Sequence, residues 1–351
     1  MTSPRASRHL RLIQHALLYT TKCIRVLLFR LSSLRPFSSL NLLTPSSLLP
    51  PAGRKDETDL RALIPRGSWD SHMHVLDPRF PLDAAAVYKP SHFHTSQDAR
   101  TFETDIAGLD GVVIVQPSIY SHDNACTLSA LKALGGPERA RAVVSFDPAT
   151  TPQETLKEWH SLGVLRGRGA AALEELEAAI RDYADAARPL GWVLQIYASL
   201  PTIAKLEPLL ADGAEQLGVR VCIDHMGHPD LKASRYSETA DPYTIPGFAS
   251  LARLLRSGNT WTKLSAAYRF SASDDGFSDA APVARELLRV AGSSRVVFAT
   301  DWPHTRFEGL DIRPWIRTVL YDLCQRDEAL IERVFRGNAE ELWSPALPTE
   351  R

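Results

Sequence analysis

Four ionisable side chains stand in three short motifs that are widely separated along the 351-residue chain. His72 and His74 belong to the run WDSHMH, His225 to DHMGH and Asp301 to TDWPH. Imidazoles beside a carboxylate can ligate a divalent ion, or they can move protons and stabilise a developing oxyanion. Residues of these types could therefore form either a metal site or an acid–base site.

Each of these residues has an ordinary structural explanation when it is taken alone. A single histidine in a strand is usually a buried residue whose hydrogen bonds are satisfied, and a single aspartate at a strand end usually caps a helix. Their joint placement at the ends of three predicted strands favours one shared site instead.

The elements that must position these residues are eight short strands. They are predicted at 69–75, 112–117, 142–146, 164–168, 192–197, 219–224, 260–267 and 296–300. Amphipathic segments alternate with them, including 174–188, 202–217, 247–256, 282–290 and 312–324, and a last helix is predicted over 332–343.

Alternating strands and helices indicate a parallel sheet with right-handed crossovers. Eight strands predict an α/β fold that closes into a (β/α)8 TIM barrel, a single domain over residues 66–345. An open doubly wound sheet is the alternative, but no glycine-rich GxGxxG turn follows the first strand.

In barrels of this kind the active site forms where the strands end. His72 and His74 are two positions apart at the end of the first predicted strand, so their side chains point to the same side. His225 follows the sixth predicted strand and Asp301 follows the eighth. All four are therefore expected to face the same mouth of the barrel.

Residues 1–60 are expected to lie outside this fold, as a basic leader and linker. Nine of the 40 basic residues fall in 1–55, where no acidic residue occurs. Such an Arg-rich and Ser-rich leader is typical of a mitochondrial transit peptide, which predicts a mitochondrial location, with the cytoplasm as the alternative. Lys22, Arg25 and Arg30 interrupt its apolar run and disfavour a stable membrane span. A disordered or cleavable extension is the third interpretation.

The rest of the chain holds 31 basic and 41 acidic residues, so no nucleic-acid partner is expected. The four cysteines of the whole chain follow no paired pattern and are predicted to be reduced, buried thiols (Cys23, Cys126, Cys222 and Cys324). The oligomeric state is not indicated by the sequence.

The motifs together resemble the amidohydrolase superfamily, whose barrels begin with HxH on the first strand and place an aspartate at the end of the eighth. The runs WDSHMHVLDP, VVIVQPS, GWVLQIYASLP, VCIDHMGHPD, TKLSAAYR and FATDWPH are similar to the branch of 2-pyrone-4,6-dicarboxylate lactonase. This resemblance implies a hydrolase that opens a lactone or similar ester of a small carboxylated metabolite. Asp301 would activate water, while His72, His74 and His225 would supply hydrogen bonds or positive charge to the oxyanion.

The resemblance also bears on metal dependence. Metal-dependent members take further ligands from the fourth and fifth strands, where this chain offers residues such as Arg168 and Gln195, which are poor zinc ligands. No cofactor is therefore expected, with zinc held by His72, His74 and Asp301 as the alternative. The corresponding alternative function is a zinc-dependent decarboxylase or amidohydrolase, and a second alternative is a non-catalytic barrel scaffold.

Six polar residues near the predicted strand ends are expected to bind the substrate: Arg269, Tyr197, Ser118, His228, Arg168 and Tyr88. Arg269 leads because a guanidinium can form two parallel hydrogen bonds with a carboxylate, whereas Arg168 has a surface charge as its alternative explanation. Compared with the family, the loop after the strand at 164–168 is short, and His228 replaces an arginine. These differences indicate either a substrate with fewer acidic groups or a chain that lacks a piece.

Overall fold

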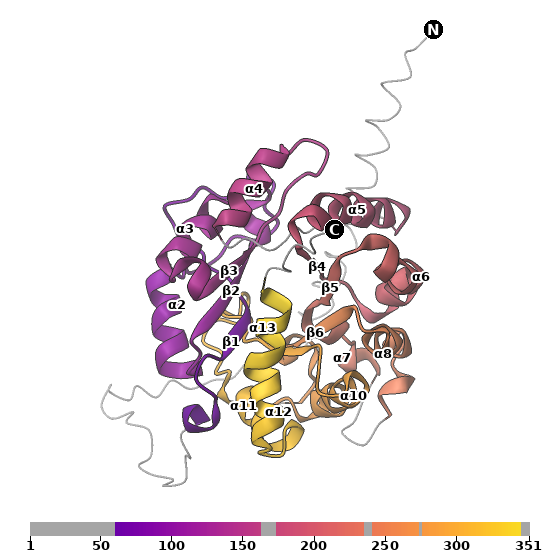
Figure 1. Ribbon diagram of the computed structural model, residues 1–351. Helices are drawn as coiled ribbons and strands as arrows, with labels where there is room; N and C mark the ends of the chain where they lie inside the picture. Colours follow the sequence, from indigo (N-terminus) through magenta and orange to yellow (C-terminus); the bar gives the residue numbers. More distant parts are fainter. Residues whose placement is uncertain (1–59, 163–172, 235–240, 274–275, 345–351) are drawn as a thin grey trace, which may run out of the picture. The chain divides into compact units, whose positions relative to one another are not determined.

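The computed structural model describes residues 60–162, 173–234, 241–273 and 276–344 (Figure 1). Within these ranges, seven strands form the inner layer of the molecule: β1 (Trp69–Met73), β2 (Gly111–Val115), β3 (Ala140–Val143), β4 (Val193–Ile196), β5 (Arg220–Ile223), β6 (Thr260–Leu264) and β7 (Val296–Phe298). Every pair is parallel, in the orders β1-β2-β3 and β4-β5-β6-β7. Each strand overlaps one of the eight predicted, and the α/β barrel is confirmed.

The two groups of strands are joined between β1 and the segment after β7. Met73 forms a parallel bridge with Trp302, and the His74 N–H donates to the Trp302 carbonyl at 2.8 Å. The Asp301 N–H donates to the His72 carbonyl, also at 2.8 Å. These contacts bring the HxH motif beside the aspartate. The strand predicted at 164–168 lies outside the described residues, as do residues 1–59 of the predicted leader.

Helices surround the strands (Figure 1). The longer ones are α2 (Ser96–Phe102), α3 (Ala125–Ala133), α4 (Gln153–Ser161), α5 (Leu173–Ala187), α6 (Leu200–Leu217), α8 (Phe248–Ser257) and α10 (Ala281–Ala291). Shorter helices are α7 (Leu231–Ser234), α9 (Ala267–Phe270), α11 (Arg313–Arg317), α12 (Glu328–Glu332) and α13 (Asn338–Trp343). The helices predicted over 312–324 and 332–343 are not regular α-helices, because π-helical segments follow α11 at Thr318–Leu323 and precede α13 at Arg333–Gly337.

Side chains on both faces of β1, β2 and β6 are buried, and β2 is apolar throughout, whereas β1 and β6 also bury polar side chains such as Asp70 and Lys263. The last helix, α13, lies across the ends where the strands begin (Figure 1). Arg141 at the start of β3 donates to the Trp343 carbonyl at 3.0 Å, and Arg220 at the start of β5 donates to the Glu341 carbonyl at 2.6 Å. The opposite mouth, where the strands end, is left for the site.

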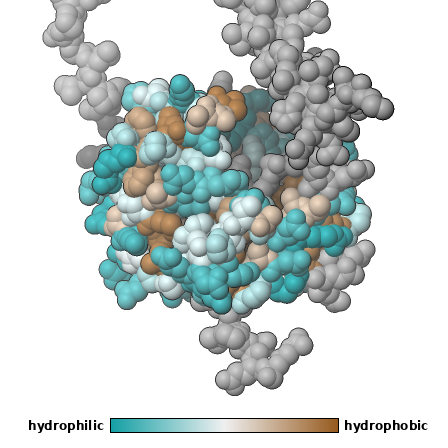
Figure 2. All heavy atoms as spheres, turned by 90° about the horizontal axis from the view of Figure 1, so that it is seen from above, coloured by the Kyte–Doolittle hydropathy of each residue, from teal (hydrophilic) through white to brown (hydrophobic). Residues whose placement is uncertain are grey.

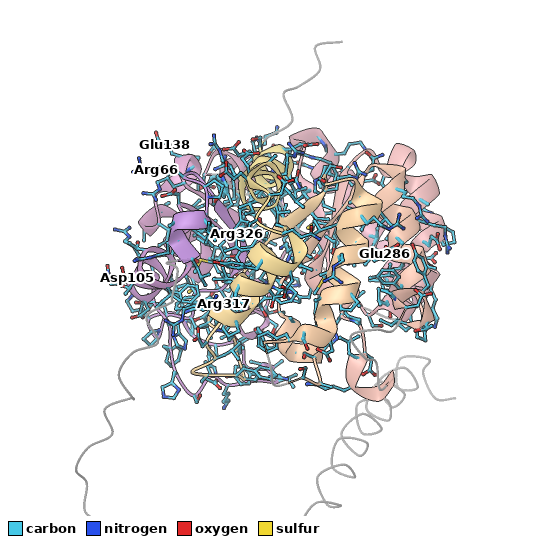
Figure 3. All side chains as sticks on the ribbon, turned by 90° about the horizontal axis from the view of Figure 1, so that it is seen from below. Arg66, Asp105, Glu138, Glu286, Arg317 and Arg326 are labelled. Atoms are coloured by element: carbon cyan, nitrogen blue, oxygen red, sulfur yellow. The ribbon has the colours of Figure 1, made fainter. Side chains whose placement is uncertain are left out.

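The outer surface is polar and mixed in charge. On the face shown in Figure 2, hydrophobic side chains occur in small groups between hydrophilic ones. Charged residues labelled in Figure 3, among them Asp105, Glu138 and Arg317, lie on the outer elements and not on the strands. No helix in the described ranges is both long and apolar enough to cross a membrane. Cys126 and two other described cysteines are buried free thiols, as predicted.

Candidate active site

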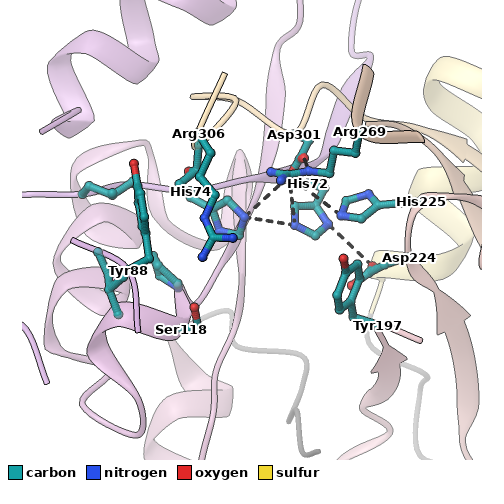
Figure 4. Close-up of a pocket in the computed structure, with 14 residues that line it drawn as sticks. His72, His74, Tyr88, Ser118, Tyr197, Asp224, His225, Arg269, Asp301 and Arg306 are labelled. Atoms are coloured by element: carbon teal, nitrogen blue, oxygen red, sulfur yellow. Dashed lines mark hydrogen bonds and ion pairs between the residues drawn. The ribbon is translucent and has the colours of Figure 1, made fainter. Parts of the chain in front are cut away.

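The four motif residues meet at the mouth of the barrel (Figure 4). His72 Nε2 lies 3.3 Å from His74 Nε2, and each of these nitrogens lies 3.6 Å from Asp301 Oδ1. His225 Nε2 lies 3.9 Å from the same carboxylate oxygen. Three imidazoles therefore converge on one oxygen of Asp301.

Left-handed backbone turns aim these side chains. Asp301 has a φ of 61°, and the turn after β5 has φ values of 53° at His225 and 55° at Met226. Residues other than glycine rarely adopt this conformation, which costs on the order of 1–3 kcal/mol at each position. Strained residues of this kind concentrate at functional sites, and here they follow β5 and β7, two of the three strands that carry the site.

The two carboxylate oxygens of Asp301 differ in their contacts. Oδ2 accepts hydrogen bonds from Tyr268 Oη at 2.7 Å and from Arg269 Nε at 2.8 Å. Oδ1 accepts none from any residue that the structure describes. Burial opposes ionisation of Asp301, but the imidazoles of His225 and His74 and the Arg269 guanidinium hold its pKa well below the ordinary value. Asp301 is thus a carboxylate with one oxygen available to a water molecule.

The imidazoles of His72 and His225 are neutral at neutral pH. Burial, reinforced by the positive charge of Lys263, lowers the pKa of His72 well below the ordinary value. Burial also lowers the pKa of His225 to about 4. His225 Nδ1 lies 2.7 Å from the Ser265 hydroxyl, and His74 Nδ1 lies 2.8 Å from the Val115 carbonyl. Of the two predicted means of stabilising an oxyanion, burial favours hydrogen bonds over positive charge.

A buried polar network behind His72 was missed by sequence reasoning. The Lys263 ammonium donates to Gln195 Oε1 at 2.7 Å and lies 3.1 Å from both Asp224 Oδ1 and His72 Nδ1. The Gln195 amide in turn donates to Asp224 Oδ2 at 2.7 Å. A lysine inside the buried strand TWTKL is rare in proteins and was the signal that could have revealed this network.

A pocket of about 230 Å³ opens above the four motif residues. Four of the residues predicted to bind substrate line it, namely Arg269, Tyr197, Ser118 and Tyr88. Arg306, which was not predicted, also lines it and places its guanidinium 4.9 Å from the ring centre of Tyr88 (Figure 4).

Two other residues predicted to bind substrate do not join this lining. His228 does not line the pocket; its ring packs against that of Tyr197, with 5.7 Å between the ring centres. The left-handed turn at 225–228 explains this position, because it carries His228 past the mouth. Arg168 lies outside the described residues.

Distances alone would allow a divalent ion at this site. One ligand atom each from His72, His225 and Asp301 lie within 4.8 Å of one another. This group contains His225 in place of His74, which the sequence analysis named as a ligand only for the alternative that zinc binds. Imidazole and carboxylate are suitable donors for zinc, provided that each imidazole offers a lone pair.

Comparisons with known proteins agree with this geometry. The profile of the amidohydrolase family matches residues 69–344. The 4-sulfomuconolactone hydrolase of Hydrogenophaga intermedia is 31% identical over 258 residues, which cover 71% of this chain and 78% of the relative. The 2-pyrone-4,6-dicarboxylate hydrolase of Comamonas testosteroni is 28% identical and covers 69% and 78% of the two chains. A crystal structure of an apo Agrobacterium tumefaciens protein superposes with a TM-score of 0.66 at 27% identity, covering 81% of this chain and 98% of that one.

Proposed function

The chain belongs to the amidohydrolase family, and on this premise we propose that it opens a lactone of a small anionic metabolite with water activated by Asp301, without a resident metal ion. The observation that carries the proposal is the free Oδ1 of an ionised Asp301 surrounded by three imidazoles. A base of this kind beside hydrogen-bonding groups suits addition of water to an ester carbonyl.

The substrate class follows from the pocket and from the relatives. Both curated relatives are named for lactone or pyrone substrates that bear sulfonate or carboxylate groups. In this chain, Arg269 and Arg306 line a pocket of about 230 Å³, a size suited to a single-ring metabolite. A guanidinium binds a carboxylate or sulfonate through charge-assisted hydrogen bonds. An anionic lactone therefore fits the pocket better than a neutral one.

The imidazoles of His225 and His74 have different roles in the proposed reaction. The Ser265 hydroxyl can donate to Nδ1 of His225, which leaves the proton of His225 on Nε2 as a donor to the carbonyl oxygen. His74 donates its Nδ1 proton to Val115, so its Nε2 accepts a hydrogen bond from the attacking water. Asp301 Oδ1 then removes the water proton as the tetrahedral intermediate forms, and returns it to the leaving alkoxide as the ring opens.

Asp301→Asn tests this function. The Asn oxygen can replace Oδ2 and keep the hydrogen bonds from Tyr268 and Arg269, while its amide faces the pocket and cannot accept a proton. We expect kcat/KM for a carboxylated or sulfonated lactone to fall by at least about 100-fold, with unchanged affinity for the ring-opened product by calorimetry. Asp311→Asn, on the exposed part of the same loop, is the matched control.

Two results would contradict the proposal. A near wild-type rate in Asp301→Asn would remove Asp301 as the base. Loss of lactone hydrolysis when the purified protein is stripped of bound zinc, with recovery on adding zinc, would replace the metal-free reaction by the zinc-dependent alternative. The same lactone panel should include neutral lactones, which we expect to react more slowly because they offer Arg269 and Arg306 no carboxylate or sulfonate to bind.

A further inference from the structure

A fully buried lysine lies behind the imidazole of His72. Lys263 is on β6, its side chain has no exposed surface, and its ammonium is 5.3 Å from the ring centre of Trp343. Burying an ammonium costs on the order of several kcal/mol unless other groups compensate it. The contacts of the Lys263 ammonium should therefore indicate the role of its charge.

Lys263, Gln195 and Asp224 form a closed ring of polar contacts. The ammonium contacts the Gln195 oxygen at 2.7 Å and Asp224 Oδ1 at 3.1 Å, while the Gln195 amide donates to Asp224 Oδ2 at 2.7 Å. The ring balances the two charges and fixes the ammonium in place. From this fixed position the ammonium also contacts His72 Nδ1 at 3.1 Å.

We infer that Lys263 is a positioning residue that keeps the proton of His72 on Nε2, the nitrogen that faces the pocket. An ammonium has hydrogens to donate and no lone pair, so His72 Nδ1 accepts in its 3.1 Å contact with Lys263; the other group that faces Nδ1, Asp224 Oδ1, lies farther away at 3.5 Å. A neutral imidazole that accepts at Nδ1 carries its proton on Nε2. The inferred tautomer exists without substrate, and only its catalytic consequence rests on the proposed function.

The contacts of His74 indicate the opposite tautomer, with the proton on Nδ1. Its Nδ1 lies 2.8 Å from the Val115 carbonyl, which can only accept a hydrogen bond. His74 Nε2 therefore presents a lone pair, and it lies 3.3 Å from His72 Nε2. A donor on His72 and an acceptor on His74 follow independently from the contacts behind each ring.

This arrangement does not fit a metal ligand at His72. A histidine that ligates a metal usually donates its second N–H to a carboxylate, a carbonyl or water. His74 meets that pattern through Val115, whereas His72 faces an ammonium and has no lone pair left for the pocket. Lys263 thus disfavours an ion in the group of His72, His225 and Asp301, and it reserves His72 as a hydrogen-bond donor to the oxyanion of the lactone.

The tautomer of His72 can be measured in the wild-type protein. NMR of the full chain with ¹⁵N-labelled histidine distinguishes the two neutral forms of each ring, and His72→Gln assigns the signals. We expect the proton of His72 on Nε2 and that of His74 on Nδ1. A proton on His72 Nδ1 would overturn the inference. Absence of lactone turnover alongside the expected tautomers would refute the proposed function and leave this inference intact.

Lys263→Met tests the consequence for metal binding. In the wild-type structure, His72 Nδ1 lies 3.5 Å from Asp224 Oδ1. Without the ammonium, Nδ1 can donate to this oxygen, and Nε2 gains a lone pair. We expect zinc affinity, measured by competition with a chelator, to rise at least tenfold and kcat to fall at least tenfold with a smaller change in KM. Lys132→Met on exposed α3 is the control. Zinc affinity equal to that of the wild type would contradict the inference.

A second variant allows the same test if Lys263→Met does not fold. Lys263→Met leaves the buried Asp224 carboxylate without its cation, which can prevent folding. The double variant Lys263→Met/Asp224→Asn removes both charges and keeps an oxygen that accepts from His72 Nδ1. The same rise in zinc affinity is expected in this variant, and its absence in a folded protein would also overturn the inference.

Discussion

At the scale of single residues, the two carboxylate oxygens of Asp301 have different functions. Oδ2 is held by Tyr268 and Arg269, and Oδ1 is left for water. Hydrogen bonds to Oδ2 favour the charged form of the carboxyl group. The low pKa of the base is thus set both by imidazoles of the site, His225 and His74, and by Arg269 behind Oδ2.

Tyr268→Phe should raise the pKa of Asp301, because it removes a hydrogen bond to the charged form and leaves the ring in place. The base would then be protonated at higher pH, and the acid limb of the kcat/KM profile should move upward in pH. The profile of a hydrolysed lactone between pH 3 and 8 measures this shift. Tyr321→Phe, on the outer layer, should leave the limb unchanged. If the acid limb does not move in Tyr268→Phe, the Tyr268 hydroxyl does not influence the pKa of Asp301.

The sequence predicted some of these residues and not others for a physical reason. His72, His74, His225 and Asp301 follow strands directly, so local patterning was enough to bring them to one mouth. Lys263 acts through contacts with side chains from other strands, and such contacts depend on how the strands pair.

At the scale of elements, a buried carboxylate ties β1 to the segment after β7. Asp70 accepts from the His72 N–H at 3.0 Å and from the Thr300 N–H at 2.9 Å, and the Thr300 hydroxyl also donates to it. Glu103 is buried beside it, and within the described chain neither of its oxygens has a hydrogen-bond donor. Burial, followed by the charge of Asp70, raises the pKa of Glu103 well above the ordinary value.

Glu103→Gln should therefore stabilise the protein near neutral pH. A carboxyl whose pKa is raised by folding favours the folded state below its unfolded pKa of 4.5, and that contribution is lost as pH rises toward the folded pKa. Gln has no proton to lose and can donate its amide to Asp70. We expect a higher Tm than wild type at pH 7 and a smaller difference at pH 4.5. Glu138→Gln, which is exposed, should show neither change.

The elements were also predicted unevenly. The apolar strands and α5, α6, α8 and α10 were found because their patterns are local. The helix at 312–324 was predicted as continuous, but its second half is π-helical, a change in hydrogen-bond register that hydrophobic periodicity does not encode.

At the scale of the whole molecule, buried histidines make folding sensitive to acid. Burial lowers the pKa of His225 and of His304 to about 4. A histidine whose pKa is lowered by folding contributes stability above its unfolded pKa of about 6.5. That contribution is lost as pH falls from 6.5 toward 4. The free energy of unfolding should decline over this window.

His304→Asn should reduce this decline. Asparagine tolerates the left-handed backbone at this position, where φ is 59°, and it does not titrate. We expect the difference in Tm between pH 7 and pH 5 to be smaller than in the wild type, as measured by calorimetry. His122→Asn, at an exposed position, provides the comparison. An equal acid loss in both variants would show that His304 does not contribute.

The joining of β1 to the segment after β7 has a consequence for protein synthesis. Asp70 and Thr300, which hold this junction, are 230 residues apart. A ribosome therefore releases His72 and His74 long before it makes Asp301, and α13 follows later still. The pocket cannot assemble before Asp301 has been synthesised, so a chain that has made only β1 to β6 lacks its catalytic base.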